Sequence, residues 1–158
     1  MATVTLNRKV KSLSAPMTPD QTFKLNDYKG KNLVLYFYPK DATPGCTLEG
    51  QDFRDAKGKF TRQNTLIFGI SRDSLASHEK FKAKQKFNFE LISDEDEKLC
   101  QYFDVIKEKN LYGKKFMGIV RSTFLIGADG KLKKEWRKVK VKGHVEEVLG
   151  AVKELHKQ

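Results

Sequence analysis

The chain of 158 residues predicts an α/β fold with a mixed central sheet and helices on both faces. Two short apolar runs, Leu33–Tyr38 and Thr65–Ile70, have the composition of strands buried on both faces, and a helical pattern follows each run. Near the C-terminus, a turn signal at 128–130 separates two strand patterns and predicts a hairpin. A helical pattern closes the chain and no linker is visible, so we expect one domain over residues 1–158.

Local signals mark the ends of the predicted helices. Thr43 is a suitable N-cap, and Pro44 suits the first helical position because its missing N–H would have no partner there; this helix is expected to end at Asn64. The acids at 94–97 are expected to form a solvated helix start. The other expected elements are strands at 22–25, 91–92, 122–126 and 131–139, helices at 74–86, from Ser93 through Phe103 and at 144–156, N-caps at Ser74 and Ser93, and loops at 1–21 and 107–118.

The chain contains only two cysteines, Cys46 and Cys100, and no apolar run long enough to span a membrane. Its first residues also lack the apolar segment of a secretory signal. We therefore expect a soluble protein of the reducing cytoplasm, where a conspicuous cysteine is more often reactive than structural. Because the sequence carries no signal for a stable dimer, a monomer is expected.

Positive charge is concentrated in one part of the chain. The net charge is +11, and twelve basic residues stand against three acids between Val105 and Lys142. A basic stretch with an aromatic such as Trp136 is one pattern of nucleic-acid binding. An aromatic in an alternating strand more often packs inward while its charged neighbours face water. We therefore expect no main role in nucleic-acid binding, although the charge can attract anionic partners.

Cys46 is the strongest candidate for a reactive group. It is expected in the first turn of the helix that follows Leu33–Tyr38, where unpaired N–H groups and the helix dipole favour a thiolate over a thiol. The same loop lies at the carboxyl end of a central strand, where open α/β sheets bind their ligands. The alternative from these residues alone is a buried structural cysteine.

The residues around Cys46 match a known active-site pattern. Residues 39–46 read PKDATPGC, which fits P-x-x-x-T-x-x-C without a gap. The chain therefore resembles the peroxiredoxins, and in particular their bacterioferritin comigratory protein (PrxQ) branch, with a thioredoxin-like fold. The similarity extends from about Pro16 to Leu155 and includes the segments Thr47-Leu48-Glu49, Phe53-Arg54-Asp55, Ile70-Ser71, Leu91-Ile92-Ser93-Asp94 and Arg121-Ser122-Thr123-Phe124-Leu125-Ile126.

This resemblance implies a thiol-dependent peroxidase that reduces hydrogen peroxide and organic hydroperoxides. Cys46 would be the peroxidatic nucleophile, whose thiolate attacks a peroxide oxygen and becomes a sulfenic acid. Arg121 begins a strand expected to run antiparallel to Leu33–Tyr38, so its charge would stabilise the thiolate and the leaving oxygen; without the resemblance it would be interpreted as a surface residue. The other implied roles are a hydroxyl donor at Thr43, a pocket wall at Pro39, and substrate-binding residues at Gly45 and Glu49.

The sequence departs from the family where the second thiol is expected. Many members of this branch carry a resolving cysteine at the position of Gln51 or near that of Lys82. Cys100, the other thiol, is either a structural residue on the apolar side of a helix or a resolving residue. The resolving role requires that the first helical turn, which holds Cys46, unwinds or that Cys100 is exposed. We expect a one-cysteine cycle in which an external thiol such as thioredoxin, glutaredoxin or glutathione reduces the sulfenic acid.

Two other functions stay open at this point, and no cofactor is expected. A thiol–disulfide exchange protein on the same fold is disfavoured because a C-x-x-C pair is missing. A non-catalytic alternative is a redox sensor or basic binding module. No metal site is expected, because the spacing of His78, His144 and His156 does not resemble a zinc site and these residues are expected on helix surfaces or helix ends.

Overall fold

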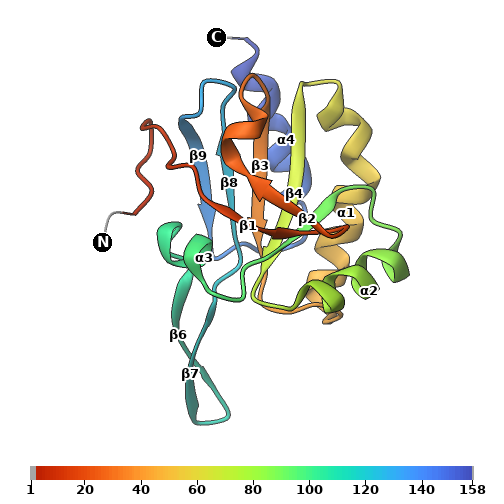
Figure 1. Cartoon of the computed structure of the whole chain (residues 1–158), viewed down its shortest axis with the longest axis vertical. Coiled ribbons are helices and arrows are strands. Elements are labelled where there is room, and N and C mark those ends of the chain that lie inside the picture. Colours follow the sequence, from red (N-terminus) through yellow and green to blue (C-terminus); the bar gives the residue numbers. More distant parts are fainter. Residues whose placement is uncertain (1–2, 158) are drawn as a thin grey trace.

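A seven-stranded mixed sheet forms the centre of the computed structural model, which describes residues 3–157 (Figure 1). Its strand order is β2-β1-β5-β4-β3-β8-β9, and β6 pairs with β7 in a separate two-stranded sheet. The strands are β1 (Ser14–Met17), β2 (Gln21–Lys24), β3 (Asn32–Phe37), β4 (Thr65–Ser71), β5 (Glu90–Ser93), β6 (Ile106–Leu111), β7 (Lys114–Ile119), β8 (Ser122–Ile126) and β9 (Leu132–Arg137). The helices are η1 (Leu25–Tyr28), α1 (Pro44–Thr61), α2 (Leu75–Gln85), α3 (Lys98–Tyr102) and α4 (His144–Leu155).

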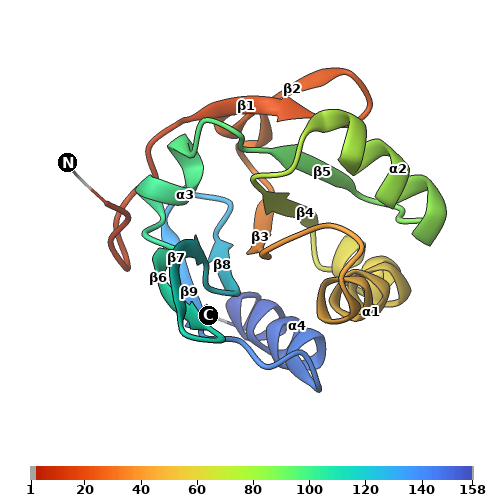
Figure 2. The ribbon, with the colours of Figure 1, turned by 90° about the horizontal axis from the view of Figure 1, so that it is seen from below.

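Helices cover both faces of the sheet, as the sequence predicts. Strands β3, β4 and β5 are parallel, whereas β8 runs antiparallel to β3 and β9 antiparallel to β8. Helices α1, α2 and α4 contribute to the apolar cluster on one face, and α3 packs with the N-terminal segment on the other (Figure 2). The expected mixed α/β architecture is therefore confirmed.

Strand β3 lies at the centre of both cores. All six of its residues are buried, and side chains alternate between the faces because a strand has a period of two. Leu35 and Phe37 enter the core beside α3, whereas Val34 and Tyr36 enter the core beside α1. The carboxyl end of β3 therefore leads into α1 from a fixed point in the middle of the molecule.

The expected loop at 1–21 is wrong over its second half. Residues 14–17 form β1, which pairs antiparallel with β2 and touches β5 through Met17 and Ile92. The alternation of exposed and buried residues in β1 is only four residues long and contains Pro16, so it is a weak strand signal. Residues 1 and 2 of that expected loop lie outside the described part of the chain.

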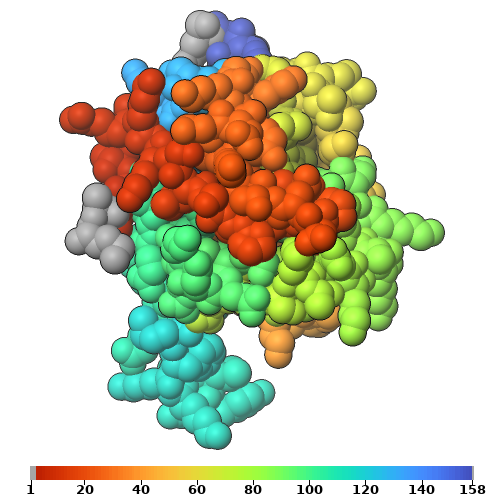
Figure 3. Space-filling model, viewed as in Figure 1, coloured from red at the N-terminus to blue at the C-terminus, as the bar shows by residue number. Residues whose placement is uncertain are grey.

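The expected irregular segment at 107–118 is also wrong, because it forms the β6–β7 hairpin. The chain reverses at Tyr112 and Gly113, which both have positive φ angles of 53° and 78°, as a tight hairpin turn requires. Figures 1 and 3 show this hairpin extending away from the rest of the molecule. The alternation that normally reveals a strand is missing here, since Leu111, Phe116 and Met117 are exposed.

The third helix is shorter than expected and has a different cap. It begins at Lys98, whose N–H donates to Asp96 Oδ1 at 3.2 Å. Asp94 accepts from the next two N–H groups, those of Leu99 at 3.1 Å and Cys100 at 2.7 Å. Ser93 instead donates to the Asp73 carbonyl oxygen. Asp94 is fully buried, so the first acid of the run at 94–97 is not solvated as expected.

The other helix ends agree closely with the sequence pattern. Pro44 is the first residue of α1, which ends at Thr61, three residues before the expected Asn64. Ser74 caps α2 by accepting a hydrogen bond from the Ser77 N–H at 3.1 Å. None of the helices within residues 3–157 combines the length and apolar composition that crossing a membrane requires.

Replacing Asp94 should destabilise the protein through α3. Asp94→Ala leaves two buried N–H groups without an acceptor, and we expect a loss of about 2–4 kcal/mol in the free energy of unfolding. Asp94→Asn keeps an acceptor oxygen and should lose less. Urea unfolding measures both, with Glu95→Ala, an exposed acid of the same run, as control. Equal losses in Asp94→Ala and Glu95→Ala would contradict the capping role.

Candidate active site

Cys46 lies in the first turn of α1, directly after the loop that leaves β3. Thr43 has the extended conformation of an N-cap residue, and Pro44 follows at the first helical position. The Thr47 N–H closes the first turn by donating to the Thr43 carbonyl oxygen at 2.9 Å. Only 2% of Cys46 is exposed, so the sulfur lies in a protected position among the first N–H groups of the helix.

Arg121 reaches Cys46 from the neighbouring strand. Phe37 at the end of β3 pairs with Ser122 at the start of β8, which brings the residue before β8 to the same edge of the sheet as α1. The Nη2 group donates to Cys46 Sγ at 3.4 Å, and Nη1 donates to Glu49 Oε1 at 2.6 Å. One guanidinium therefore joins the sulfur to a carboxylate.

The guanidinium is charged despite its partial burial. The Arg121 side chain is 16% exposed, and burial alone would lower its pKa. The negative charges of Glu49 and Cys46 beside it outweigh burial and raise the pKa of Arg121 above its ordinary value. Arg121 can thus supply a permanent positive charge next to the sulfur.

Glu49 lies one turn after Cys46 on the same helix and is fully buried. Burial raises the pKa of its carboxyl from 4.5 to about 7, and the nearby Arg121 opposes this rise. Its Oε2 atom and the Tyr36 hydroxyl are both buried without a hydrogen-bond partner among the described residues. Glu49 therefore keeps its proton at pH values at which an ordinary carboxyl group has already lost it.

Gly45 allows the guanidinium to approach the helix. A Cβ atom built at this position would lie 3.1 Å from Arg121 Nη2, closer than most real Cβ contacts. With any larger residue here, the guanidinium would have to move by a few tenths of an ångström. This is a steric reason for glycine directly before Cys46.

Thr43 and Pro39 belong to the loop that precedes Cys46. The Thr43 hydroxyl donates to the Lys40 carbonyl oxygen at 2.8 Å, so in this structure it closes the loop rather than contacting the sulfur. Pro39 is half-buried and lies two residues after the end of β3. The expected roles of both residues toward a peroxide stay predictions.

Cys100 lies away from this site. It is fully buried on α3 and belongs to the apolar cluster on one face of the sheet, whereas Cys46 belongs to the cluster on the other face. Burial, followed by the negative charge of Asp94, raises the pKa of the Cys100 thiol far above its ordinary value. Both cysteines are free, and these surroundings are those of a structural thiol.

The histidines were expected on helix surfaces or at helix ends, which is wrong for His78 inside α2, whereas His144 does begin α4 but is not on the surface. His144 is buried, where its Nε2 lies 2.8 Å from the Thr123 hydroxyl, and burial lowers its pKa to about 4. His78 is fully buried and lies 2.7 Å from Asp41. Only His156 is exposed, at the end of α4. Each buried ring lies within the first turn of its helix, on the side that faces the sheet. Over so few residues, helical periodicity gives only a weak signal of which side is buried.

Part of the basic excess lies near the active site. Partial burial, followed by the positive charge of Arg121, lowers the pKa of Lys109 on β6, which places this side chain within electrostatic range of the guanidinium. Trp136 is half-buried on β9 and packs edge-on against His144, with ring centroids 5.8 Å apart. This position agrees with the inward packing that the sequence predicts for Trp136.

Residues 6–135 of the chain match the model of the AhpC/TSA family. The chain belongs to this family of peroxiredoxins. Peroxiredoxin Bcp of Bacillus subtilis (strain 168) is 50% identical over 153 residues, which cover 97% of this chain and 98% of the relative. Peroxiredoxin Bcp of Xanthomonas campestris is 55% identical over 134 residues, or 85% of this chain and 84% of that protein.

Solved structures lead to the same family. Peroxiredoxin Q of Xanthomonas campestris superposes with a TM-score of 0.86 at 52% identity, covering 89% of each chain. A cysteine-to-serine variant of Xylella fastidiosa PrxQ gives a TM-score of 0.93 at 42% identity and covers both chains completely. The expectations of a thioredoxin-like fold and of a peroxiredoxin of the PrxQ branch are confirmed. The protein is a thiol-dependent peroxidase.

Glu49→Gln should change the pH dependence of stability. The folded peroxiredoxin holds the Glu49 proton up to about pH 7, whereas the unfolded chain releases it near pH 4.5. The folded state thus binds more protons between these values, so the free energy of unfolding falls as the pH rises. At about 1.4 kcal/mol per pH unit, this carboxyl alone removes on the order of 3 kcal/mol.

The Glu49→Gln variant lacks this contribution because glutamine does not ionise. Urea unfolding of both proteins from about pH 5 to about pH 8 measures the difference between their slopes. Glu79→Gln on the exposed side of α2 is the matched control and should run parallel to the wild type. A Glu49→Gln curve that also runs parallel would show that Glu49 ionises as freely in the folded protein as in the unfolded chain.

Proposed function

We propose that this peroxiredoxin reduces hydrogen peroxide and organic hydroperoxides with Cys46 as its peroxidatic thiol. The observation that carries the proposal is the Arg121 guanidinium, which donates to the sulfur at 3.4 Å in the first turn of α1. A related structure describes the alkyl peroxide reduction activity of the Xanthomonas campestris bacterioferritin comigratory protein, at 51% identity over 89% of this chain. That relative supports the inclusion of organic hydroperoxides.

In the oxidative step, the Cys46 thiolate attacks one oxygen of the peroxide. A bond forms between sulfur and that oxygen while the O–O bond breaks, and the electron pair of the broken bond goes to the leaving oxygen. The leaving oxygen takes up a proton and departs as water or an alcohol, and Cys46 becomes a sulfenic acid. Arg121 stabilises the negative charge of the sulfur before the attack and that of the leaving oxygen as the O–O bond breaks.

The neighbours of Cys46 support this step in different ways. Glu49 holds the guanidinium through its 2.6 Å hydrogen bond, and Gly45 leaves room for it. We assign the backbone N–H groups of Gly45 and Cys46 to the peroxide, because the first N–H groups of a helix have no partner within it. Pro39 is proposed to exclude water, and Thr43 to offer its hydroxyl to the substrate.

In the reductive step, an external thiol attacks the sulfenic acid. The products are a mixed disulfide with Cys46 and water, and a second thiol then releases Cys46 and leaves with the first as a disulfide. The burial of Cys100 in the opposite core supports this one-cysteine cycle. So does the residue near the position where other members carry a resolving cysteine, because it is Lys82, which forms an ion pair with Glu90 at 2.7 Å. Candidate reductants are thioredoxin, glutaredoxin and glutathione, and we propose a monomer in a reducing cytoplasm.

Substitution of each cysteine tests the assignment of the reactive thiol. Cys46→Ser should abolish peroxide consumption, because serine is a far weaker nucleophile, and Cys100→Ser should keep most of it. Mass spectrometry after one equivalent of peroxide should find the added oxygen on Cys46. A Cys46→Ser protein with full activity would end the proposal, and an intramolecular Cys46–Cys100 disulfide would replace the one-cysteine cycle.

Substitution of Arg121 tests the charge beside the sulfur. Arg121→Ala should lower the second-order rate constant of Cys46 oxidation by about 10²-fold or more, as expected for the loss of one preorganised donor. Arg121→Lys keeps the charge without the two-pronged geometry and should fall between Ala and wild type. Arg137→Ala on β9 is the control. Wild-type rates in Arg121→Ala would contradict its role.

A further inference from the structure

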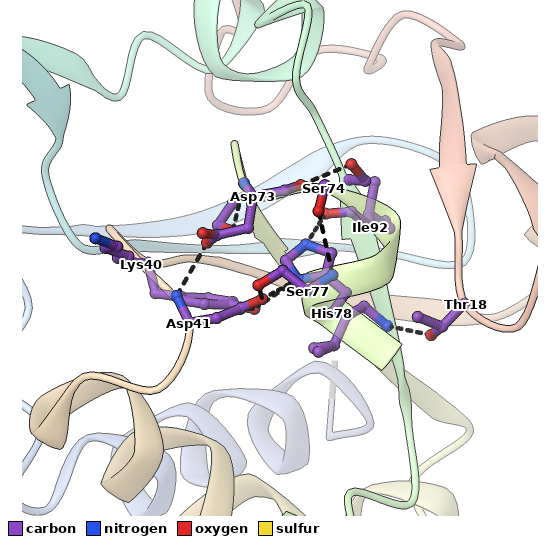
Figure 4. Close-up of polar contacts among 12 residues, drawn as sticks. Thr18, Lys40, Asp41, Asp73, Ser74, Ser77, His78 and Ile92 are labelled. Carbon is purple, nitrogen blue, oxygen red and sulfur yellow. Dashed lines mark hydrogen bonds and ion pairs between the residues drawn. The ribbon is translucent and has the colours of Figure 1, made fainter. Parts of the chain in front are cut away.

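A buried polar cluster attaches the loop between β3 and α1 to the start of α2 (Figure 4). Figure 4 shows Asp41 on this loop facing His78 and Ser77 on α2, with Asp73 beside them. No hydrogen bond among the described residues joins the cluster to Cys46 or Arg121. The peroxidase mechanism above therefore leaves these groups unused.

Asp41 is the centre of the cluster. Its Oδ1 accepts from the Tyr38 hydroxyl at 2.6 Å, and its Oδ2 accepts from the Ser77 hydroxyl at 2.8 Å. The same Oδ2 lies 2.7 Å from His78 Nδ1. The Asp41 side chain is only 4% exposed, so a carboxylate here depends on these three partners for its stability.

The contacts of His78 place a proton between its ring and Asp41. The Nε2 atom lies 2.9 Å from the Ile92 carbonyl oxygen, which can only accept, so Nε2 carries a hydrogen. If Nδ1 carried none, its lone pair would face a carboxylate oxygen at 2.7 Å inside the protein. A proton between the two atoms turns this repulsion into a charge-assisted hydrogen bond of ordinary length.

A metal ion fits this position less well than a proton. Asp41, Asp73 and His78 each offer a ligand atom, and these atoms lie within 4.8 Å of one another. Zinc ligands lie about 2.0–2.2 Å from the metal on different corners of a tetrahedron, which holds two ligand atoms farther apart than a hydrogen bond does. The 2.7 Å separation of Nδ1 and Oδ2 is that of a hydrogen bond, and Ser71 and Ser77 already donate to the carboxylates.

The cluster also fixes the main chain of the active-site loop. The Asp41 N–H donates to Asp73 Oδ2 at 2.9 Å, and the Ser71 hydroxyl donates to the same oxygen at 2.5 Å. The next residue, Ala42, has a φ of 63°, in the left-handed region that is unfavourable for a residue with a Cβ. Thr43, the N-cap of the Cys46 helix, follows directly. The strained residue thus lies between the cluster and the helix that carries the sulfur.

We propose that Asp41 and His78 are a positioning pair for the peroxidase reaction. Their shared proton holds the loop so that Ala42 keeps its left-handed conformation, and this conformation sets the place of the first turn of α1 relative to Arg121. The role rests on the proposed function of Cys46 as the reacting thiol. Its size is appreciable because a misplacement of about 1 Å at a reacting group can cost about 10²-fold in rate.

Two conservative variants remove the pair from either side. His78→Gln keeps a donor for the Ile92 carbonyl oxygen and loses the one for Asp41, and Asp41→Asn removes the charge and keeps the size. Each should lower the second-order rate constant of Cys46 oxidation about tenfold or more, measured by quenched flow and mass spectrometry. The double variant should be no slower than the slower single variant, since the two residues act as one unit.

A matched control separates positioning from general loss of stability. Asn32 is buried at the opposite end of β3, where it accepts from the Ala128 N–H and donates to the Gln63 carbonyl oxygen. Asn32→Ala should lower the free energy of unfolding and leave the rate of Cys46 oxidation unchanged. Ser77→Ala removes a single neutral donor from the carboxylate of Asp41 and, as the mildest change, should lower the rate about threefold.

Two further measurements address the proton and the strain directly. In ¹⁵N-labelled protein, both ring nitrogens of His78 should carry protons, one of them strongly shifted downfield, and Asp41→Asn should remove that signal. Ala42→Gly in the Asp41→Asn background should restore part of the rate, because glycine adopts positive φ without the Cβ penalty. A merely structural cluster predicts no such rescue.

The outcomes that overturn the proposal are distinct from those that end the proposed function. A wild type whose Cys46 does not react with peroxide ends both. A reactive wild type ends the positioning role alone if folded His78→Gln and Asp41→Asn oxidise at the wild-type rate, if their effects add, or if Asn32→Ala is slowed equally. The lack of a downfield-shifted proton between His78 and Asp41, or an absent rescue by Ala42→Gly, also overturns it.

Discussion

The hydrogen bonds of Arg121 are the constraint on which the active site depends. The guanidinium contacts a sulfur and a carboxylate that lie one turn apart on α1, while its own main chain precedes a different strand. This arrangement requires the antiparallel pairing of β3 with β8, which aligns the two chain segments at one edge of the sheet. Glycine before the cysteine also favours it, because a Cβ there would lie only 3.1 Å from Arg121 Nη2. Fold, register and local sequence thus combine to place one positive charge.

Burial gives that charge its strength and also has a cost. A charge pair that is shielded from water interacts strongly, but each partner loses its hydration. Glu49 shows this balance, since burial raises the pKa of its carboxyl to about 7 even beside a guanidinium. Glu49 Oε2 and the Tyr36 hydroxyl, which are buried without a hydrogen-bond partner in the described part of the chain, belong to the same unfavourable environment. The active site is therefore a locally costly region carried by the stability of the two apolar cores around β3.

The sequence was sufficient for the parts of the protein that are encoded locally. The apolar run of β3, the Thr43-Pro44 helix start and the cysteine behind it are neighbours in the chain, so composition and capping rules predict them. The β6–β7 hairpin was not predicted, because its outward side chains include large apolar residues and the usual alternation of apolar and polar residues is missing. The pairing of Asp41 with His78 was not predicted for another reason. These residues are 37 positions apart, and only the packing of α2 against the loop brings them together.

The 2% exposure of Cys46 has different consequences for the two substrates of a peroxidase cycle. A molecule of two oxygens needs only a narrow path to the sulfur, whereas a thiol carried by another protein brings its own backbone and must displace part of α1. If the reductant of the proposed cycle is a protein thiol, the reductive half draws on a transient open form, whose population depends on the local stability of the first helical turn. Any contact that makes this turn more rigid favours capture of the oxidant and delays regeneration. Turnover is then fastest at an intermediate rigidity, so selection for speed acts against maximal order around the sulfur.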